Sequence, residues 1–204
     1  MCGVILSAGA SSRMGRDKAL LPWPPGATSR TLLSASIAAL KPFAEQIIVV
    51  AGNNAVTLAP LIAANGAAMA QNTAPERGQF SSLQIGLREA LAHGCDAAMI
   101  TLVDCPPLTD ASMKKLIESF DQALANEKWG VAPEHNGRRG HPLVVNGELM
   151  NAFLSAPVTS NAREVKRAHA AMIVSVPVSD SLVSIDVNTP EQYAALAESE
   201  SNRR

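Results

Sequence analysis

Small and basic residues gather directly after the first apolar run of the chain. Val4–Leu6 leads into a loop, residues 7–18, that is rich in serine, alanine and glycine and also contains two arginines and Lys18. Small side chains let backbone N–H groups approach an anion closely, while Arg and Lys supply the charge that a polyphosphate needs. The spacing differs from the P-loop motif G-x-x-x-x-G-K, because five residues separate Gly9 from Gly15 and Lys18 comes three positions after Gly15. We predict a phosphate-binding loop of another kind; the alternative is a solvated strand-to-helix loop with incidental basic residues.

A carboxylate follows a second apolar run. Asp104 stands at the end of Ala98–Val103, at the position where open α/β sheets bind ligands. Mg²⁺ prefers one or two carboxylates together with substrate phosphates and water, so Asp104 is a candidate metal ligand. Its alternative role is to open the turn before Pro106 and Pro107. No Cys-His arrangement supports Cys105 as a nucleophile, and we expect a small buried thiol there.

Two further segments carry polar residues at positions suited to ligand binding. Asp186 and Asn188 lie on one face of an extended segment just before a helix, so they could complete a metal or phosphate site. The alternative is that Asn188 and the following threonine only cap that helix. The basic turn Gly137–Pro142, with Arg139 and His141, could contact an anionic substrate, although such turns are more often merely solvated.

The elements that must position these residues alternate along the chain. Short branched apolar runs, which predict strands, are Val4–Leu6, Ile47–Val50, Ala98–Val103, Gly130–Ala132, Leu143–Val145, Ile173–Val176 and Leu182–Ile185. Helix-compatible spacing occurs between them at Leu32–Leu40, Ala55–Ala64, Leu83–Ala92, Ser112–Leu124, Arg163–Ala170 and Pro190–Ala197. This alternation predicts an α/β sheet with helices on its faces. We expect one domain over residues 1–204, with a frayed polar tail at 198–204.

Composition excludes several classes of function. The formal net charge is -1 and aromatic residues make up 3% of the 204 residues, so neither a polyanion-binding surface nor stacking platforms for nucleic acid are expected. No apolar run approaches the roughly 20 residues that a membrane-spanning helix requires. The N-terminus lacks the basic start of a signal peptide, and the three cysteines form no Cys-x-x-Cys pair. These features favour the reducing cytoplasm.

The motifs, taken in order, resemble the MobA-like NTP transferase family. Its opening motif is roughly L-A-A-G-x-S-x-R-M-G-x-x-K, and Ser7 departs from the usual Ala. The matching residues are Leu6, Ala8, Gly9, Ser11, Arg13, Met14, Gly15 and Lys18. The family's N…G…S…G segment is matched by Asn72, Gly78, Ser82 and Gly86. Its motif D-x-P is matched at Asp104–Pro106, its G-x-P turn at Gly140–Pro142, and its closing D-x-[DN]-T-P-E at Asp186–Glu191. Within the family the chain most resembles the molybdenum cofactor cytidylyltransferases, through Ala8-Gly9 and the continuation Asp17–Trp23.

The resemblance implies a fold and a set of site residues. The fold is a three-layer, Rossmann-like nucleotidyltransferase fold with a mostly parallel mixed sheet. Arg13, Lys18 and Asp104 would be catalytic, and Asp104 and Asp186 would hold Mg²⁺, with Mn²⁺ as a substitute. Nucleotide binding would involve Leu6, Ser7, Ala8, Gly9, Ser11, Arg13, Gly15, Lys18, Asn72, Gly78 and Ser82. The acceptor side would include Arg139, His141 and Asn188.

The implied reaction transfers a nucleotidyl group, CMP from CTP, to a phosphate monoester such as molybdopterin and releases pyrophosphate. A molybdoenzyme or a chaperone would receive the product. A sugar or isoprenoid phosphate remains an alternative acceptor, because related cytidylyltransferases share the first loop and the carboxylates. A non-catalytic nucleotide-binding regulator is another alternative, although it would not need both Asp104 and Asp186. A nucleotide-sugar glycosyltransferase is disfavoured, since Asp104-Cys105-Pro106 lacks the second Asp of D-x-D.

Overall fold

Strand β1 (Cys2–Ser7) lies within an eight-stranded sheet in the computed structural model, which describes residues 1–201. Successive side chains of a strand point to opposite faces of a sheet. Accordingly, Val4 and Leu6 pack on one side of the sheet and Ile5 on the other, each in a buried apolar layer. Every residue of β1 is buried, as expected for a strand whose two faces are both covered by helices.

The sheet is mixed and mostly parallel. Its order is β3-β2-β1-β4-β7-β5-β6, and β8 pairs with β5 in addition. Strand β7 alone runs antiparallel to both of its long neighbours, β4 and β5, whereas β1, β2, β3 and β4 are parallel. The bounds are Gln46–Ala51 (β2), Ala68–Gln71 (β3), Ala97–Leu102 (β4), Gly130–His135 (β5), Arg138–Arg139 (β6), Leu143–Asn146 (β7) and Ile173–Pro177 (β8).

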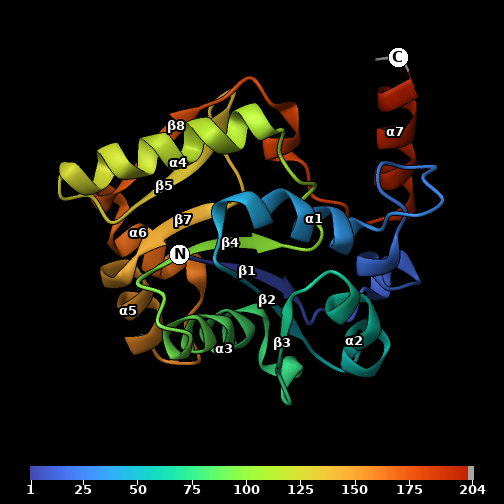
Figure 1. The fold of residues 1–204 in the computed structure, drawn as a ribbon, viewed down its shortest axis with the longest axis horizontal. Coiled ribbons are helices and arrows are strands. Elements are labelled where there is room, and N and C mark those ends of the chain that lie inside the picture. The colour runs from blue at the N-terminus through green and yellow to red at the C-terminus, as the bar shows by residue number, and fades with distance from the viewer. Residues whose placement is uncertain (202–204) are drawn as a thin grey trace.

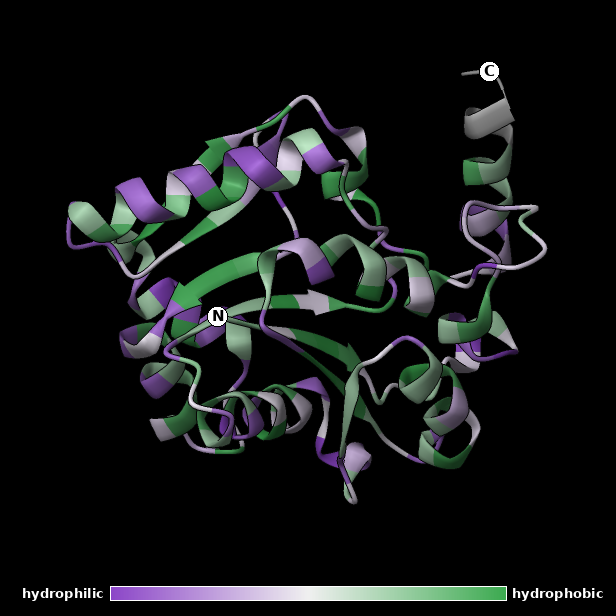
Figure 2. Ribbon diagram, in the orientation of Figure 1, coloured by the Kyte–Doolittle hydropathy of each residue, from purple (hydrophilic) through white to green (hydrophobic). Residues whose placement is uncertain are grey.

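Helices cover both faces of this sheet and complete the expected three layers (Figure 1). One apolar layer contains residues of α1 (Leu32–Leu40), α2 (Ala55–Ala64) and α4 (Asp110–Ala125). The opposite layer contains residues of α3 (Gln79–Ala92), α5 (Gly147–Ser155) and α6 (Ala162–Ala168). The central strands are strongly hydrophobic, while the helices alternate hydrophobic and hydrophilic residues around their surfaces (Figure 2). The fold predicted by the family resemblance is thereby confirmed.

The last helix packs beside the first loop. Helix α7 (Pro190–Ser201) lies next to the segment that follows β1 (Figure 1). Its Leu196 belongs to a third apolar cluster together with Met14, Leu21 and Val187. The Tyr193 hydroxyl donates a hydrogen bond to the Pro22 carbonyl oxygen at 2.6 Å. This packing joins the two ends of the chain at the place where the phosphate-loop motif stands.

Some predicted elements differ from the structure. Leu182–Ile185 was expected to be a strand, but Ser181–Ser184 forms a 3-10 turn, because Asp180 accepts a hydrogen bond from the Leu182 N–H at 3.0 Å and starts the turn. Helix α7 continues to Ser201, beyond the expected end at Ala197, and the rest of the expected frayed tail, 202–204, lies outside the described residues.

Two strands and a helix were not predicted. Strand β3 contains no branched apolar residue, and β6 has only two residues. Helix α5 begins at a glycine, which is a poor helix former. Its start depends on Asn146, whose side-chain oxygen accepts a hydrogen bond from the Leu149 N–H at 3.2 Å.

The cysteines are arranged in a way that the sequence did not indicate. Cys2, at the start of β1, forms a disulfide with Cys95, just before β4, whereas Cys105 is free and buried. Residues 93 positions apart meet because β1 and β4 are neighbours in the sheet. The cysteine pattern therefore no longer supports a reducing compartment. Among the described residues, no helix is both long and apolar enough to cross a membrane.

Candidate active site

Hydrogen bonds to one side chain hold the loop after β1 in place. The Asn54 amide donates to the Ser7 carbonyl oxygen at 2.9 Å and to a carboxylate oxygen of Asp17 at 2.7 Å. Asp17 also caps the 3-10 turn Lys18–Leu20 by accepting a backbone N–H at 3.0 Å. Asn54 thus ties both ends of the loop to the start of α2. Sequence patterns did not single it out, because its role depends on three segments that meet only in the fold.

The loop bends back on itself through two residues with left-handed backbone. Ser11 has φ 50° and Gly15 has φ 71°. This region is easily reached by glycine and costs energy for a residue with a side chain. The Ser11 hydroxyl accepts a hydrogen bond from the Lys18 N–H at 3.3 Å, which closes the loop. The small residues of the motif therefore serve the curvature of the loop.

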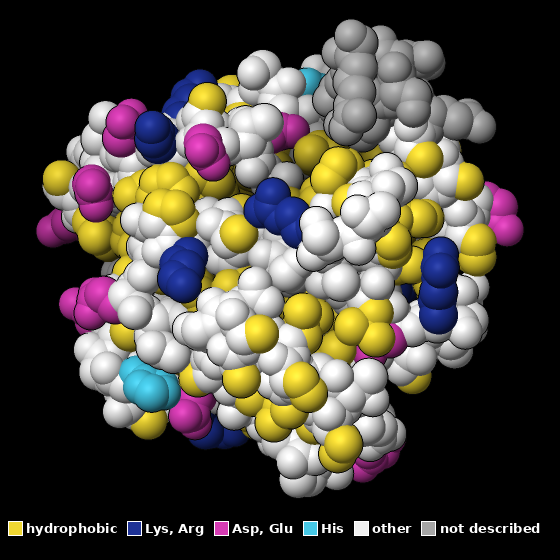
Figure 3. Space-filling view, turned by 45° about the vertical axis from the view of Figure 1, so that its right-hand side comes forward, with side chains coloured by type: hydrophobic (Ala, Val, Ile, Leu, Met, Phe, Trp, Pro, Cys, Tyr) yellow, Lys and Arg dark blue, Asp and Glu magenta, His cyan; other side chains and the backbone are white. Residues whose placement is uncertain are grey.

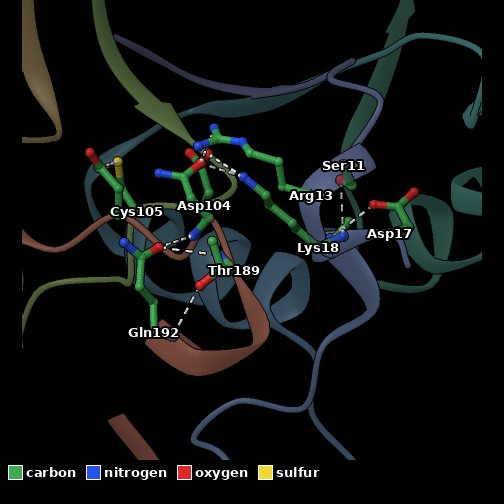
Figure 4. A network of polar contacts seen from close by, with 11 residues as sticks. Ser11, Arg13, Asp17, Lys18, Asp104, Cys105, Thr189 and Gln192 are labelled. Carbon is green, nitrogen blue, oxygen red and sulfur yellow. Dashed lines mark hydrogen bonds and ion pairs between the residues drawn. The ribbon is translucent and has the colours of Figure 1, made fainter. Parts of the chain in front are cut away.

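Lys18 is the centre of a polar network that joins three distant segments (Figure 4). Its ammonium donates to Asp104 Oδ2 at 2.9 Å and to Asn188 Oδ1 at 2.7 Å. The same amide oxygen of Asn188 accepts from Arg13 Nη2 at 3.2 Å. Lys18 is only 8% exposed, so its charge is held in a place with limited access to water. Hydrogen bonds between charged groups are stronger than neutral ones, and they orient the ammonium firmly.

Backbone contacts explain why Asn188 stands beside Asp104. The Val187 N–H donates to the Asp104 carbonyl oxygen at 2.8 Å, which ties the segment before α7 to the end of β4. The Gln192 side-chain oxygen then accepts the N–H groups of Asn188 and Thr189, at 2.8 and 3.1 Å. Gln192 positions Asn188 and was not predicted, although the spacing Thr189-x-x-Gln192 is that of a capping box, in which the Thr189 hydroxyl accepts the Gln192 N–H at 3.3 Å.

The second carboxylate and the buried thiol lie next to each other. Cys105 Sγ donates to Asp186 Oδ1 at 3.2 Å, while the Asp186 residue itself is exposed. Burial, followed by the negative charges of Asp104 and Asp186, raises the pKa of the Cys105 thiol far above its usual range. The thiol therefore remains protonated at neutral pH and is not an activated nucleophile.

The carboxylates of Asp104 and Asp186 fit a metal ion that takes its remaining ligands from the bound substrate. No cluster of three or more His, Cys, Asp or Glu residues in residues 1–201 could hold a metal on its own. Asp104 and Asp186 belong to the segments joined by the Val187 hydrogen bond, and both charges act on Cys105. Mg²⁺ and Mn²⁺ suit sites with one or two carboxylates whose remaining positions are filled by phosphate oxygens and water.

Most predicted phosphate-site residues surround one small concavity, which we call the central hollow. Its volume is about 120 Å³ and it is lined by Leu6, Ala8, Gly9, Ser11, Lys18, Gly78, Ser82 and Asp104, among others. A wider hollow of about 740 Å³ adjoins it and includes Ala8, Gly9, Gly15, Arg16, Asn53 and Asn54. The two share several loop residues, so they form one continuous depression along the loop.

Other predicted site residues take different places. Ser7 is buried, and its hydroxyl has no hydrogen-bond partner among the described atoms; only its backbone oxygen contributes, by accepting from Asn54. Arg139 is exposed and donates to the Ser175 hydroxyl at 2.6 Å, at the edge of the sheet. His141 faces another cavity and contacts the Ile100 carbonyl oxygen at 3.2 Å. Asn188 lies in the Lys18 network, and its expected role on the acceptor side stays a prediction.

Asn72 holds two serines of the site in place. Its buried amide nitrogen donates to the hydroxyls of Ser81 and Ser82, both at 2.9 Å, and Ser82 lines the central hollow. We expect Asn72→Ala to lower the free energy of unfolding by about 1–3 kcal/mol, because buried hydroxyls lose their partner. The exposed Asn53 provides the control, and Asn53→Ala should change stability by less than about 0.5 kcal/mol. Denaturant unfolding measures both; equal losses would contradict this role of Asn72.

The fold and the site together define a class of protein. A mostly parallel sheet between helical layers carries a glycine-containing loop, a network of Lys and Asp residues and a small hollow at the carboxyl ends of β1 and β4. This is the arrangement of an α/β nucleotidyltransferase. Residues 3–173 match the model of the MobA-like NTP transferase domain, and the chain belongs to that family.

Curated relatives match the chain over nearly its whole length. A molybdenum cofactor cytidylyltransferase of Escherichia coli is 27% identical over 200 residues, covering 96% of this chain and 94% of the relative. A molybdenum cofactor guanylyltransferase of Xanthomonas euvesicatoria is 30% identical, with 95% and 93% covered. A nicotine blue oxidoreductase of Paenarthrobacter nicotinovorans is 29% identical, with 95% of both chains covered.

Solved structures share the fold. A nucleotidyl transferase from Methanothermobacter superposes with a TM-score of 0.77 at 19% identity, covering 100% of this chain and 98% of the other. A Mycobacterium tuberculosis protein, solved in complex with manganese, has a TM-score of 0.70 at 21% identity, with 97% and 98% covered. At these identities the likeness concerns the fold alone.

Proposed function

We propose that this nucleotidyltransferase moves CMP from CTP to a phosphate monoester of the molybdopterin type and releases pyrophosphate. The observation that carries this proposal is the Lys18 ammonium, held between Asp104 and Asn188 at the wall of the central hollow. A buried cation next to a carboxylate suits a triphosphate that arrives with a divalent metal ion. The cytidylyltransferase and guanylyltransferase relatives support an acceptor of this type.

In the proposed reaction, an oxygen of the acceptor phosphate attacks the α-phosphorus of the triphosphate. A bond forms between that oxygen and the α-phosphorus, and the bond to the bridging oxygen breaks, so pyrophosphate leaves with the electron pair. A phosphate nucleophile is already ionised at neutral pH, so the site needs no general base. Catalysis then consists of alignment and of charge neutralisation on the leaving group.

Different residues of the chain would bind the phosphates and the metal ion. Lys18 and Arg13 contact the phosphates from the loop side, and Asn188 keeps both cations oriented through one amide oxygen. Asp104 and Asp186 are the residues that would hold a divalent metal ion. When bound, Mg²⁺ or Mn²⁺ neutralises phosphate charge and fixes the phosphates in line. We further propose that the protein passes its product to a molybdoenzyme or a chaperone.

A pyrophosphate-release assay tests the proposal. It combines the protein with Mg²⁺ or Mn²⁺, with CTP, GTP or ATP, and with molybdopterin, sugar phosphates or isoprenoid-precursor phosphates as acceptors. Acceptor-dependent release supports nucleotidyl transfer, and the best acceptor decides between molybdopterin and the alternatives. Nucleotide binding without release would favour a non-catalytic regulator. Because one relative is named an oxidoreductase, a hydride-transfer assay tests for that activity as the alternative to nucleotidyl transfer.

The Lys18→Ala variant should lose both affinity and rate. The charge of Lys18 serves the bound triphosphate and the transition state alike, so we expect the Kd for the nucleotide and kcat each to worsen by about 10- to 100-fold. Titration calorimetry gives the Kd and pyrophosphate release gives kcat. Lys114→Ala, at an exposed position of α4, is the matched control and should behave as wild type. If both quantities in Lys18→Ala stay within about twofold, the central hollow does not bind the triphosphate.

A further inference from the structure

The carboxylate proposed to hold the metal ion already has a cation of the chain as its partner. Lys18 Nζ lies 2.9 Å from Asp104 Oδ2, and the two groups form an ion pair. In residues 1–201, no other basic side chain forms an ion pair with Asp104. The side chains of Lys18 and Asp104 are 11% and 21% exposed, so water and salt screen this pair only weakly.

Burial distinguishes Lys18 from the other cations of the chain. On the face of the molecule drawn in Figure 3, Lys and Arg side chains stand as separate spots at the surface, as solvated cations do. Within the part of the chain that the structure describes, Lys18 is the only buried lysine or arginine. A buried ammonium costs free energy unless a counter-charge accompanies it. Asp104 supplies that charge, whereas the second partner, Asn188 Oδ1 at 2.7 Å, is neutral.

A divalent ion and the Lys18 ammonium compete for this one carboxylate. Mg²⁺ binds oxygen atoms at about 2.0–2.1 Å, which brings it close to any other cation on the same carboxylate. Cations this close repel each other, and the repulsion is strong where water has limited access. An ion that displaced Lys18 from Asp104 would leave the ammonium buried without its counter-charge. The ion pair therefore lowers the affinity of Asp104 for a divalent ion that arrives alone.

A triphosphate removes both obstacles. Its oxygens offer the Lys18 ammonium a new anionic partner, and they fill the metal positions that carboxylates leave open. Lys18 and Asp104 both line the central hollow, so the ammonium can turn from one to the other within the same site. The nucleotide and the divalent ion then favour each other's binding, and thermodynamic linkage makes this coupling reciprocal.

We propose that the Lys18–Asp104 ion pair keeps a divalent ion off Asp104 until a triphosphate binds and takes over Lys18. This inference rests on the proposed function and describes the regulation of the same site. It assigns Lys18 two roles of opposite sign, because its charge strengthens the binding of the nucleotide and weakens the binding of the metal ion by itself. Removing the charge should therefore change the two affinities in opposite directions.

Mn²⁺ binding, measured by electron paramagnetic resonance, tests this inference without turnover. Mn²⁺ is titrated into the wild-type protein and into Lys18→Gln, each with and without α,β-methylene-CTP, which fills the nucleotide site without reacting. Without nucleotide, we expect Lys18→Gln to bind Mn²⁺ about tenfold or more tightly than the wild type, because the competing ammonium is gone. With the analogue, this advantage should disappear, because the wild-type Lys18 then contacts phosphate.

Matched variants show whether the effect belongs to this ion pair. Arg13→Gln removes the same charge from the same network, but from an exposed side chain that bonds to Asn188 and not to Asp104. We expect it to change the Mn²⁺ affinity by less than about threefold, because water and salt screen an exposed charge. Lys18→Arg retains a cation and should keep the affinity low. Adding Asp104→Asn to Lys18→Gln should abolish the gain, and thermal melts verify that each variant is folded.

Several results would overturn the inference. One is an equal gain in Arg13→Gln, which would indicate a general charge effect, and another is an unchanged Mn²⁺ affinity in folded Lys18→Gln. The wild-type protein gives a third test that needs no variant, since equal Mn²⁺ affinity with and without the analogue would also contradict the inference. Pyrophosphate release separates the two proposals. Release with no gain in Lys18→Gln refutes only the role of the ion pair, whereas a gain without release from any acceptor refutes the proposed function and leaves Lys18 as a competitor of the metal ion.

Discussion

Asp104→Asn should reduce turnover by about 10²-fold or more while the fold is retained. Asparagine keeps the size of the side chain and an oxygen that can still accept the hydrogen bond from Lys18, which Asp104 accepts at 2.9 Å in the wild type. What the variant loses is the negative charge, on which the metal ion and the alignment of the phosphates depend. Pyrophosphate release at saturating nucleotide measures the effect, and a thermal melt verifies the fold.

Two variants act as controls for this result. Asp121→Asn removes a charge from an exposed position of α4 and should leave the rate unchanged. Cys105→Ser keeps a hydrogen-bond donor toward Asp186 and should retain most of the activity, because the buried thiol is protonated. Near-wild-type turnover in Asp104→Asn would remove this carboxylate from the mechanism, and complete loss in Cys105→Ser would restore the nucleophile hypothesis.

The sequence predicted the elements whose pattern is local. Helices α1 and α2 match their predicted bounds, since helical spacing is visible within a short window. The central strands were found because both of their faces are buried, which produces continuous apolar runs. Strand β3 was missed because its two alanines, Met69 and Gln71 lack the branched side chains that mark a strand.

The candidate site was predicted as a set of residue types but not as a geometry. The first-loop and Asp104 motifs placed Lys18 and Asp104 in one site, and the structure brings them together at 2.9 Å. The contact between Asn188 and Lys18 was not predicted, because a sequence position gives no direction for an amide that lies 170 residues from its partner.

The same limit applies to the residues that hold the site in place. Asn54 acts through the Ser7 carbonyl oxygen and the Asp17 carboxylate, which come from another segment. Asn54 belongs to no motif, and the sequence cannot reveal which oxygen atoms it will meet. Gln192, by contrast, bonds to N–H groups three and four positions before it, in the capping-box spacing Thr189-x-x-Gln192. The partners of a residue such as Asn54 are set by the folded chain, in which buried backbone groups are paired.

CTP should be used about 10- to 200-fold more efficiently than GTP. Ala8 lines both the central hollow and the wider hollow beside it, where the nucleotide would run along the loop. The backbone of Ala8 packs closely against Gly52, because a Cβ atom added to Gly52 would lie only 2.8 Å from the Ala8 carbonyl oxygen. The methyl group of Ala8 therefore cannot retreat toward Gly52. We expect it to crowd the two-ring purine and to leave room for the one-ring pyrimidine.

Measuring kcat/KM for both nucleotides with one accepted acceptor decides this prediction. Steric differences of this size are worth about 1–3 kcal/mol, so a preference and not complete exclusion is expected. Ala8→Gly removes the methyl group and should shift the ratio of the two kcat/KM values toward GTP. If Ala8→Gly lowers both values equally, the added backbone freedom is responsible and Ala8 is not the discriminating residue. Equal use of the nucleotides by the wild-type protein, or a preference for GTP, would overturn the assignment of CTP.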